Sequence, residues 1–214
     1  MESKTGIKSY KSDKEIQLDE EVLEIFNNCP IPPNQLMENL GLFLNAKNFS
    51  RILFMHHIYK QIIDVPGVII DFGTRWGNNL ALFSVFRGIY EPFNRHRKLI
   101  GFDTFTGFPS INDKDGDSKL MSKGNVACTE NYQEYLDKVM KYQEMQNPIS
   151  HIKKYEICVG DATKEIDKYL DNNPQTIVAL AYFDFDIYEP TRKCLEAIKP
   201  RLVKGSVVGF DELN

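Results

Sequence analysis

The sequence lacks an excess of positive charge and any long apolar run. It contains 26 lysine and arginine residues against 30 aspartate and glutamate residues, which gives a formal net charge of −4 and an isoelectric point near 5.6. Proteins that bind nucleic acids through phosphate contacts carry clustered positive charge, so we expect no nucleic-acid partner. No stretch approaches the roughly 18 apolar residues of a membrane span, and no charged-then-apolar leader opens the chain. We therefore expect a cytoplasmic protein without a membrane partner.

Closely spaced cysteines are also lacking. A disulfide framework or a zinc site would show cysteines in recognisable pairs, and the sequence has no C-x-x-C. We interpret the four cysteines as reduced thiols: Cys29, Cys128, Cys158 and Cys194. At 214 residues the chain suits one α/β domain with a small extension.

Residues 68–86 predict a buried strand, a tight turn and a helix. An apolar β-branched run leads to Asp71, the turn contains Gly73 and Gly77, and helical spacing begins at Asn79. Glycines let a backbone approach a ligand closely, and the start of a helix favours a negatively charged group. A dinucleotide-binding turn would read G-x-G-x-x-G, so the spacing here argues weakly for a pyrophosphate. A plain strand-to-helix turn is the alternative.

The rest of the chain alternates strands with helices. We predict strands at 98–102, 155–159, 176–183 and 206–210, with helices at 130–145, 163–170 and 191–202. This alternation predicts a doubly wound, mostly parallel, Rossmann-like sheet flanked by helices. Upstream, residues 1–14 are polar, and helices are expected at 19–27 and 48–63 around a proline-rich break. We expect a helical extension over 1–47 and the α/β domain over 48–214.

Acidic residues follow several of the predicted strands, and parallel strands end at one edge of a sheet. Asp103 stands where a doubly wound fold places its ribose-binding carboxylate, or it caps a turn. Asp161 follows the third strand, where a helix cap is the alternative function. Asp184, Asp211 and Glu212 converge after the last two strands. Close carboxylates repel, so they bind protons or share a cation, and oxygen ligands favour Mg²⁺ or another hard divalent cation. Helix capping explains one of them easily but not all.

Three motifs resemble a known family. The run D-x-G-x-x-x-G at Asp71 resembles the first motif of class I S-adenosylmethionine-dependent methyltransferases. The run F-D-T-F-x-G-F-P over residues 102–109 resembles the D-[ST]-F-x-G-[LF]-P signature of the macrocin O-methyltransferase family, which methylates sugars. The run D-x-D-x-Y-x-x-T, which begins at Asp184, resembles the matching segment of these enzymes. The resemblance covers approximately residues 48–214.

The resemblance implies site residues and a mechanism. S-adenosylmethionine would be the cofactor, and the residues implied to bind it are Asp71, Gly73, Thr74, Gly77, Asp103, Thr104, Asp161 and Ala162. The implied metal ligands are Asp184, Asp211 and Glu212. Asp184 or Asp186 would be the catalytic base, but catechol O-methyltransferases place a lysine where this chain has Ile187, which leaves the base in doubt.

The implied function is metal-dependent methyl transfer to a hydroxyl of a sugar, either a deoxysugar, a nucleotide-sugar or a surface polysaccharide. The lysine- and asparagine-rich composition suggests a bacterial source. Two alternatives stay open. One is an inactive or truncated methyltransferase-like binding domain. The other is a cephalosporin hydroxylase-like iron oxygenase, although His96 and His151 have no carboxylate at facial-triad spacing.

Two further features carry expectations. The polar segment 110–128 predicts a lid or substrate loop, and its acids Asp113, Asp115 and Asp117 imitate only the start of a calcium loop. The resemblance implies a fold of seven strands, whereas this sequence ends after the fifth predicted one, so we expect the C-terminal strands to be missing. An exposed edge strand is a pairing hazard, and we expect a longer natural protein, a covering partner or a rearranged sheet. The oligomeric state is left open, with a homo-oligomer among the options.

Overall fold

The computed structural model describes residues 12–109, 115 and 123–211. The chain divides into two compact units, and the boundary between them lies between Phe54 and Met55. That boundary falls inside helix α3 (Ala46–Gln61), so this helix contributes residues to both units. None of the described helices has the length and apolar character needed to cross a membrane.

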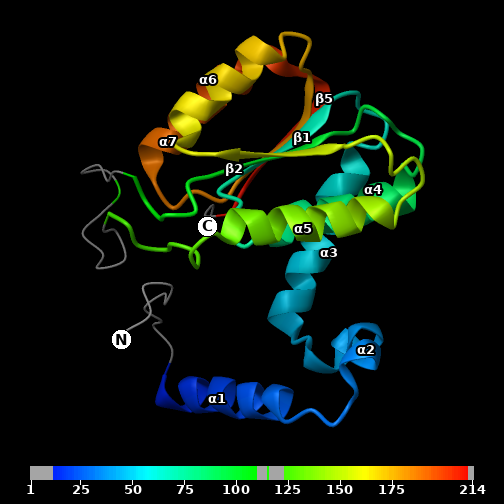
Figure 1. The fold of residues 1–214 in the computed structure, drawn as a ribbon. Helices are drawn as coiled ribbons and strands as arrows, with labels where there is room; N and C mark the ends of the chain where they lie inside the picture. The colour runs from blue at the N-terminus through cyan, green and yellow to red at the C-terminus, as the bar shows by residue number, and fades with distance from the viewer. Residues whose placement is uncertain (1–11, 110–114, 116–122, 212–214) are drawn as a thin grey trace. The chain divides into compact units, whose positions relative to one another are not determined.

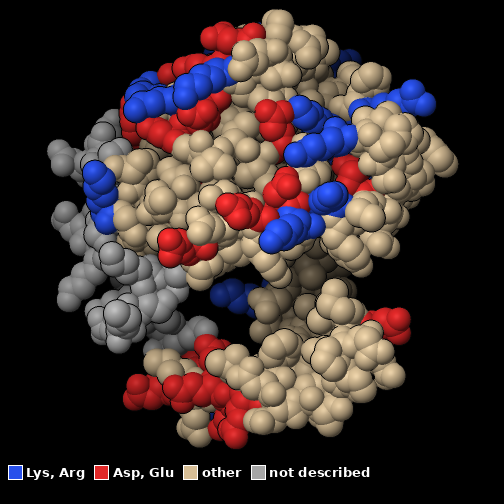
Figure 2. Space-filling model, in the orientation of Figure 1, with Lys and Arg blue, Asp and Glu red and all other residues tan. Residues whose placement is uncertain are grey.

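The N-terminal unit is helical, and none of its residues between 12 and 54 is buried. Helix α1 (Asp13–Asn27) starts with a capping box, in which the backbone N–H of Ser12 donates to the Glu15 carboxylate at 2.8 Å. Acidic side chains gather on this helix (Figure 2). Helices α2 (Pro33–Leu36) and η1 (Met37–Phe43) follow the proline-rich break. Local hydrogen bonds, rather than a core, define this unit.

The second unit is built on a five-stranded parallel sheet, which confirms the predicted fold class. The strand order is β3-β2-β1-β4-β5, and each neighbouring pair is parallel. The chain order reverses beside β1, which is the topological switch point where doubly wound sheets bind ligands. The strands are β1 (Val68–Phe72), β2 (Leu99–Asp103), β3 (Tyr155–Val159), β4 (Val178–Phe183) and β5 (Leu202–Phe210).

Helices cover both faces of this sheet, as Figure 1 shows, with α4 and α5 on one face and α6 and α7 on the other. The predicted helix over 191–202 actually starts at Tyr188 and ends at Ile198. Pro190 lies in its first turn, where the missing N–H would have no partner within the helix, so a proline is tolerated there. The helices are α4 (Asn78–Tyr90), α5 (Tyr132–Met145), α6 (Ala162–Asn172), α7 (Tyr188–Ile198) and the 3-10 turn η3 (Lys199–Arg201).

Four phenylalanines form a stack across four neighbouring strands, which we call the aromatic ladder. They are Phe102, Phe72, Phe183 and Phe210, in the order of the strands, and successive ring centroids are 5.2, 4.7 and 5.1 Å apart. Each ring belongs to the core that α6 and α7 cover. Because neighbouring residues of a strand point to opposite faces, the residue after each ring is directed toward the α4 and α5 face. The ladder therefore fixes where the next residue of each strand lies.

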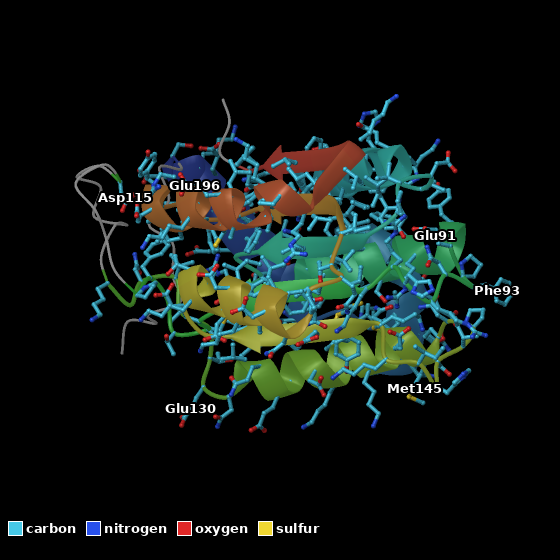
Figure 3. All side chains as sticks on the ribbon, turned by 90° about the horizontal axis from the view of Figure 1, so that it is seen from above. Glu91, Phe93, Asp115, Glu130, Met145 and Glu196 are labelled. Carbon is cyan, nitrogen blue, oxygen red and sulfur yellow. The ribbon has the colours of Figure 1, made fainter. Side chains whose placement is uncertain are left out.

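Buried charged side chains lie at the amino-terminal edge of the sheet, which is the edge opposite to the one where the aromatic ladder ends. Glu144 of α5 accepts from Arg87 at 2.8 Å and from Lys154 at 2.6 Å, and all three are nearly inaccessible to solvent. In the same way Arg97, which is 1% exposed, pairs with Glu91 at 2.9 Å. Figure 3 shows Glu91 at the end of the sheet opposite to Asp115. These pairs fasten the segments that lead into β2 and β3.

We predict that Glu144→Gln destabilises the protein by about 3–5 kcal/mol, because Arg87 and Lys154 then remain buried without a counter-charge. The free energy of unfolding from urea denaturation measures the effect. The matched control is Glu134→Gln, an exposed glutamate on the same helix, which should cost less than about 1 kcal/mol. Equal costs for the two variants would contradict the prediction.

Candidate functional site

The site lies at the carboxyl edge of the sheet, one residue beyond the aromatic ladder. Gly73, Asp103, Asp184 and Asp211 each follow a ring of the ladder. Hydrogen bonds continue the strand pairing to this level: the backbone N–H of Asp184 donates to Phe72 at 2.8 Å, and that of Asp211 donates to Phe183 at 3.0 Å. The structure thus brings together residues that are more than 100 positions apart in the sequence.

The turn between β1 and α4 needs its two glycines for packing within the protein. Gly73 has φ +84°, and a Cβ there would lie 2.3 Å from the backbone oxygen of Asp184. Gly77 has φ +76°, and a Cβ there would lie 2.2 Å from a methyl group of Leu136 on α5. Thr74 is buried and donates its hydroxyl to the backbone oxygen of Asp71 at 3.0 Å. These glycines therefore let the backbone of the turn lie close to other parts of the protein, namely Asp184 and Leu136.

Asp103 organises the loops around it through backbone hydrogen bonds. One carboxylate oxygen accepts from the N–H of Arg75 at 2.7 Å, and the other accepts from the N–H of Phe105 at 2.6 Å. Both donor residues have a positive backbone φ, 45° for Arg75 and 57° for Phe105, in a region that residues other than glycine rarely adopt. Strained backbone of this kind clusters at functional sites. Burial raises the pKa of Asp103, although these two amides act in the opposite direction.

A buried amide links two of the predicted acids. Asn79 of α4 lies between the carboxylates of Asp71 and Asp184, with Nδ2 at 3.4 Å from Asp71 Oδ1 and 3.2 Å from Asp184 Oδ2. Asp71 is fully buried, and its second oxygen, Oδ2, has no hydrogen-bond partner among the described residues. Burial, and then the negative charge of Asp184, raise the pKa of Asp71 to about 7.

The predicted metal ligands are described only in part. Asp184 is half-buried, Asp211 is exposed and accepts from the Tyr182 hydroxyl at 2.6 Å, and Glu212 lies outside the described residues. Within residues 12–109, 115 and 123–211, no group of three or more histidine, cysteine, aspartate or glutamate side chains is arranged to hold a metal ion. Asp186, the second candidate base, is half-buried two residues after Asp184.

Two other predicted cofactor contacts make local hydrogen bonds. Asp161 caps α6, because its carboxylate accepts from the backbone N–H of Thr163 at 3.0 Å and from its hydroxyl at 2.7 Å. Ala162 is buried directly after it. Thr104 donates its hydroxyl to the backbone oxygen of Gly107 at 2.7 Å. The cap alternative for Asp161 is therefore confirmed, and an additional role toward a ligand stays a prediction.

The acidic start of segment 110–128 is described at one residue. Asp115 accepts from the backbone N–H of Tyr188 at 2.7 Å, which satisfies a donor in the first turn of α7. Asp113 and Asp117 lie outside the described residues, as does most of the predicted lid.

Sequence reasoning missed Asn79 and Tyr182. One feature of the sequence points to Asn79: it is a polar residue among the apolar positions at the start of α4. In the structure it is only 5% exposed. Tyr182 looks like one more apolar residue of β4, and only Gly209 on the neighbouring strand gives its ring room to reach Asp211. His56 is half-buried beside Tyr90, and His57 is exposed.

Comparison with solved structures places this geometry in a class. The chain is similar to the crystal structure of CalS11, a calicheamicin methyltransferase, with 42% identity, a TM-score of 0.93, and coverage of 96% of this chain and 80% of that one. It is similar to the apo structure of CalS11, described as TDP-rhamnose 3'-O-methyltransferase, with 39% identity, a TM-score of 0.83, and coverage of 96% and 81%. NovP, an O-methyltransferase with 18% identity, a TM-score of 0.55, and coverage of 75% and 64%, shares the fold.

The parallel sheet, the glycine turn after β1 and the acid after β2 define a Rossmann-like methyltransferase domain. With this identity and coverage, the chain belongs to the class I S-adenosylmethionine-dependent sugar O-methyltransferases. The resemblance drawn from the sequence motifs is confirmed, and an iron oxygenase is set aside. No family model matches the chain, and no curated protein matches it.

We predict that Gly73→Ala is more destabilising than Gly124→Ala, although both glycines have nearly the same backbone conformation. Gly124 has φ +79°, and no atom of the described residues lies within 4 Å of an added Cβ, so we expect alanine there to cost backbone strain alone, about 1–2 kcal/mol. At Gly73 the contact with the Asp184 oxygen adds about 1–3 kcal/mol. Chemical denaturation of both variants tests this, and a Gly73→Ala cost no larger than that of the control would contradict the packing argument.

Proposed function

We propose that the protein transfers a methyl group from S-adenosylmethionine to a hydroxyl of a deoxysugar carried on a nucleoside diphosphate, with the help of a divalent cation. The similarity to a TDP-rhamnose 3'-O-methyltransferase over nearly the whole chain carries the choice of acceptor. A nucleotide-sugar also suits the absence of an overall positive surface charge, because a small anionic ligand needs only local positive groups.

We propose that the cofactor is held by the turn after β1 and by the ends of β2 and β3. The residues are Asp71, Gly73, Thr74, Gly77, Asp103, Thr104, Asp161 and Ala162. Two observations support the fit. Asp71 Oδ2 is buried without a hydrogen-bond partner among the described residues, and each carboxylate oxygen of Asp103, already bonded to one amide, has a second lone pair for a ligand hydroxyl. S-adenosylmethionine, when bound, supplies an electrophilic methyl group.

We propose that Asp184, Asp211 and Glu212 hold the divalent cation. Asn79 and Tyr182 are neutral donors, so their hydrogen bonds to Asp184 and Asp211 leave the negative charge of both carboxylates in place. Carboxylate oxygens are the ligands that Mg²⁺ prefers. A cation held there would lower the pKa of a bound hydroxyl. Asp184 or Asp186 would take the hydroxyl proton as the acceptor oxygen bonds to the methyl carbon and the S–CH₃ bond breaks, which leaves S-adenosylhomocysteine.

We predict that methyl transfer to TDP-rhamnose depends on added Mg²⁺ and stops in EDTA. Turnover is measured as S-adenosylhomocysteine formed. Asp184→Asn should lower kcat by about 100-fold or more, in the range of general-base and metal-ligand losses, while calorimetry still detects binding of S-adenosylhomocysteine. Full activity in EDTA would contradict the proposed metal dependence. Binding of S-adenosylhomocysteine without turnover of any deoxysugar nucleotide would favour the alternative of an inactive methyltransferase-like binding domain.

We predict that Asp103→Asn weakens S-adenosylhomocysteine binding by about 10- to 100-fold, the loss typical of hydrogen bonds to a charged group. An asparagine would also turn its NH₂ group toward the backbone N–H of Arg75 or Phe105. Titration calorimetry measures the affinity. Asp171→Asn is the matched control, because Asp171 is an exposed acid on α6. Unchanged affinity in Asp103→Asn would remove Asp103 from the cofactor site.

A further inference from the structure

We propose that Asn79 is a positioning residue that sets the orientation of the Asp184 carboxylate for the reaction. The inference rests on the proposed function, in which Asp184 acts on the acceptor hydroxyl. It concerns a residue outside the glycine and acidic motifs, on a helix whose other buried residues are mostly apolar.

The backbone of Asp184 is already fixed, which leaves its side chain as the remaining variable. The N–H of Asp184 donates to the Phe72 oxygen at 2.8 Å, and its carbonyl group packs against Gly73. The carboxylate itself is half-buried, and aspartate side chains in general have more than one staggered rotamer. Asn79 Nδ2 lies 3.2 Å from Asp184 Oδ2, so this hydrogen bond favours the rotamer that the structure shows.

Asn79 is suited to this role because its own amide is held on a rigid part of the fold. It lies in the first turn of α4 and is 5% exposed. Its NH₂ group has two hydrogens, and Nδ2 lies 3.4 Å from Asp71 Oδ1 as well. Asp71 belongs to the central strand β1 and is fully buried. The amide therefore connects a carboxylate that follows β4 to one that cannot move.

The choice of an amide also has an electrostatic reason. Asp71 lies on β1 and Asp184 directly follows the neighbouring strand β4, and two negative charges that bond to the same amide repel each other. A neutral donor between them offsets part of that repulsion without cancelling the charge that a cation or a proton needs. A lysine or an arginine at position 79 would pair with the acids and compete with a cation.

The test compares Asn79→Leu, which keeps the branched side-chain skeleton but removes the donor, with Asn78→Leu, the same change at the exposed neighbouring residue. We expect kcat of Asn79→Leu to fall by about 10- to 100-fold, as for other residues that orient a catalytic ligand. The affinity for S-adenosylhomocysteine should change by less than about threefold, and Asn78→Leu should keep both values. Asn79→Asp, which keeps the shape and adds a charge that favours a helix start, should lose kcat in the same way.

The Asp184→Asn background separates a positioning role from a structural one. Because Asn79 acts through Asp184, Asn79→Leu should cause less than about a threefold further loss of kcat there. An unchanged kcat in Asn79→Leu, an equal loss in both backgrounds, or a loss of cofactor affinity that matches the loss of kcat would each overturn the proposal. If Asp184→Asn keeps wild-type turnover, the proposed function of Asp184 is wrong. If Asp184→Asn is inactive but Asn79→Leu is fully active, only the role proposed for Asn79 is wrong.

Discussion

The aromatic ladder is the interaction on which the site depends. Four stacked rings tie β2, β1, β4 and β5 together at one level, and each stacked pair contributes about 0.5–1.5 kcal/mol beyond the burial of its area. Their greater effect is geometric. A slip of one residue in any strand would turn a ring away from α6 and α7 and move an acid to the wrong face. The packing of the core and the convergence of the acids are thus the same constraint.

The two edges of the sheet resolve the burial of charge in opposite ways. At the amino-terminal edge, Glu144 forms direct ion pairs with Arg87 and Lys154, and these two cations neutralise its negative charge. At the carboxyl edge, Asp103 accepts from the backbone amides of Arg75 and Phe105, and Asp184 accepts from the Asn79 amide, and all three of these donors are neutral. Neutral donors hold an acid in place and preserve its charge. This difference supports the proposal that the carboxyl edge is the reactive one.

Residue patterns predicted the strands and the acids that follow them, since strand periodicity and the geometry of parallel strands act locally. Residues 155–159 form a strand as predicted, and Asp103 lies at the predicted edge. Partners chosen by the tertiary fold were not predictable. The contact between Tyr182 and Asp211 joins two strands, and no spacing in either strand announces it. Helix α7 starts at Tyr188 rather than at residue 191, because the first turn of a helix accepts Pro190.

The glycine motif shows why a pattern alone indicates a site weakly. Gly73 and Gly77 would both clash with the protein itself if they carried a Cβ, so their packing against Asp184 and Leu136 would explain them without any ligand. What the motif contributes to function is the consequence of that packing. The turn is pressed against the end of β4 on one side and against α5 on the other, which leaves its backbone groups in one conformation. A preorganised turn binds a ligand without first paying the entropy of ordering itself. The demand for glycine by the fold is therefore compatible with the proposed binding of a cofactor by this turn.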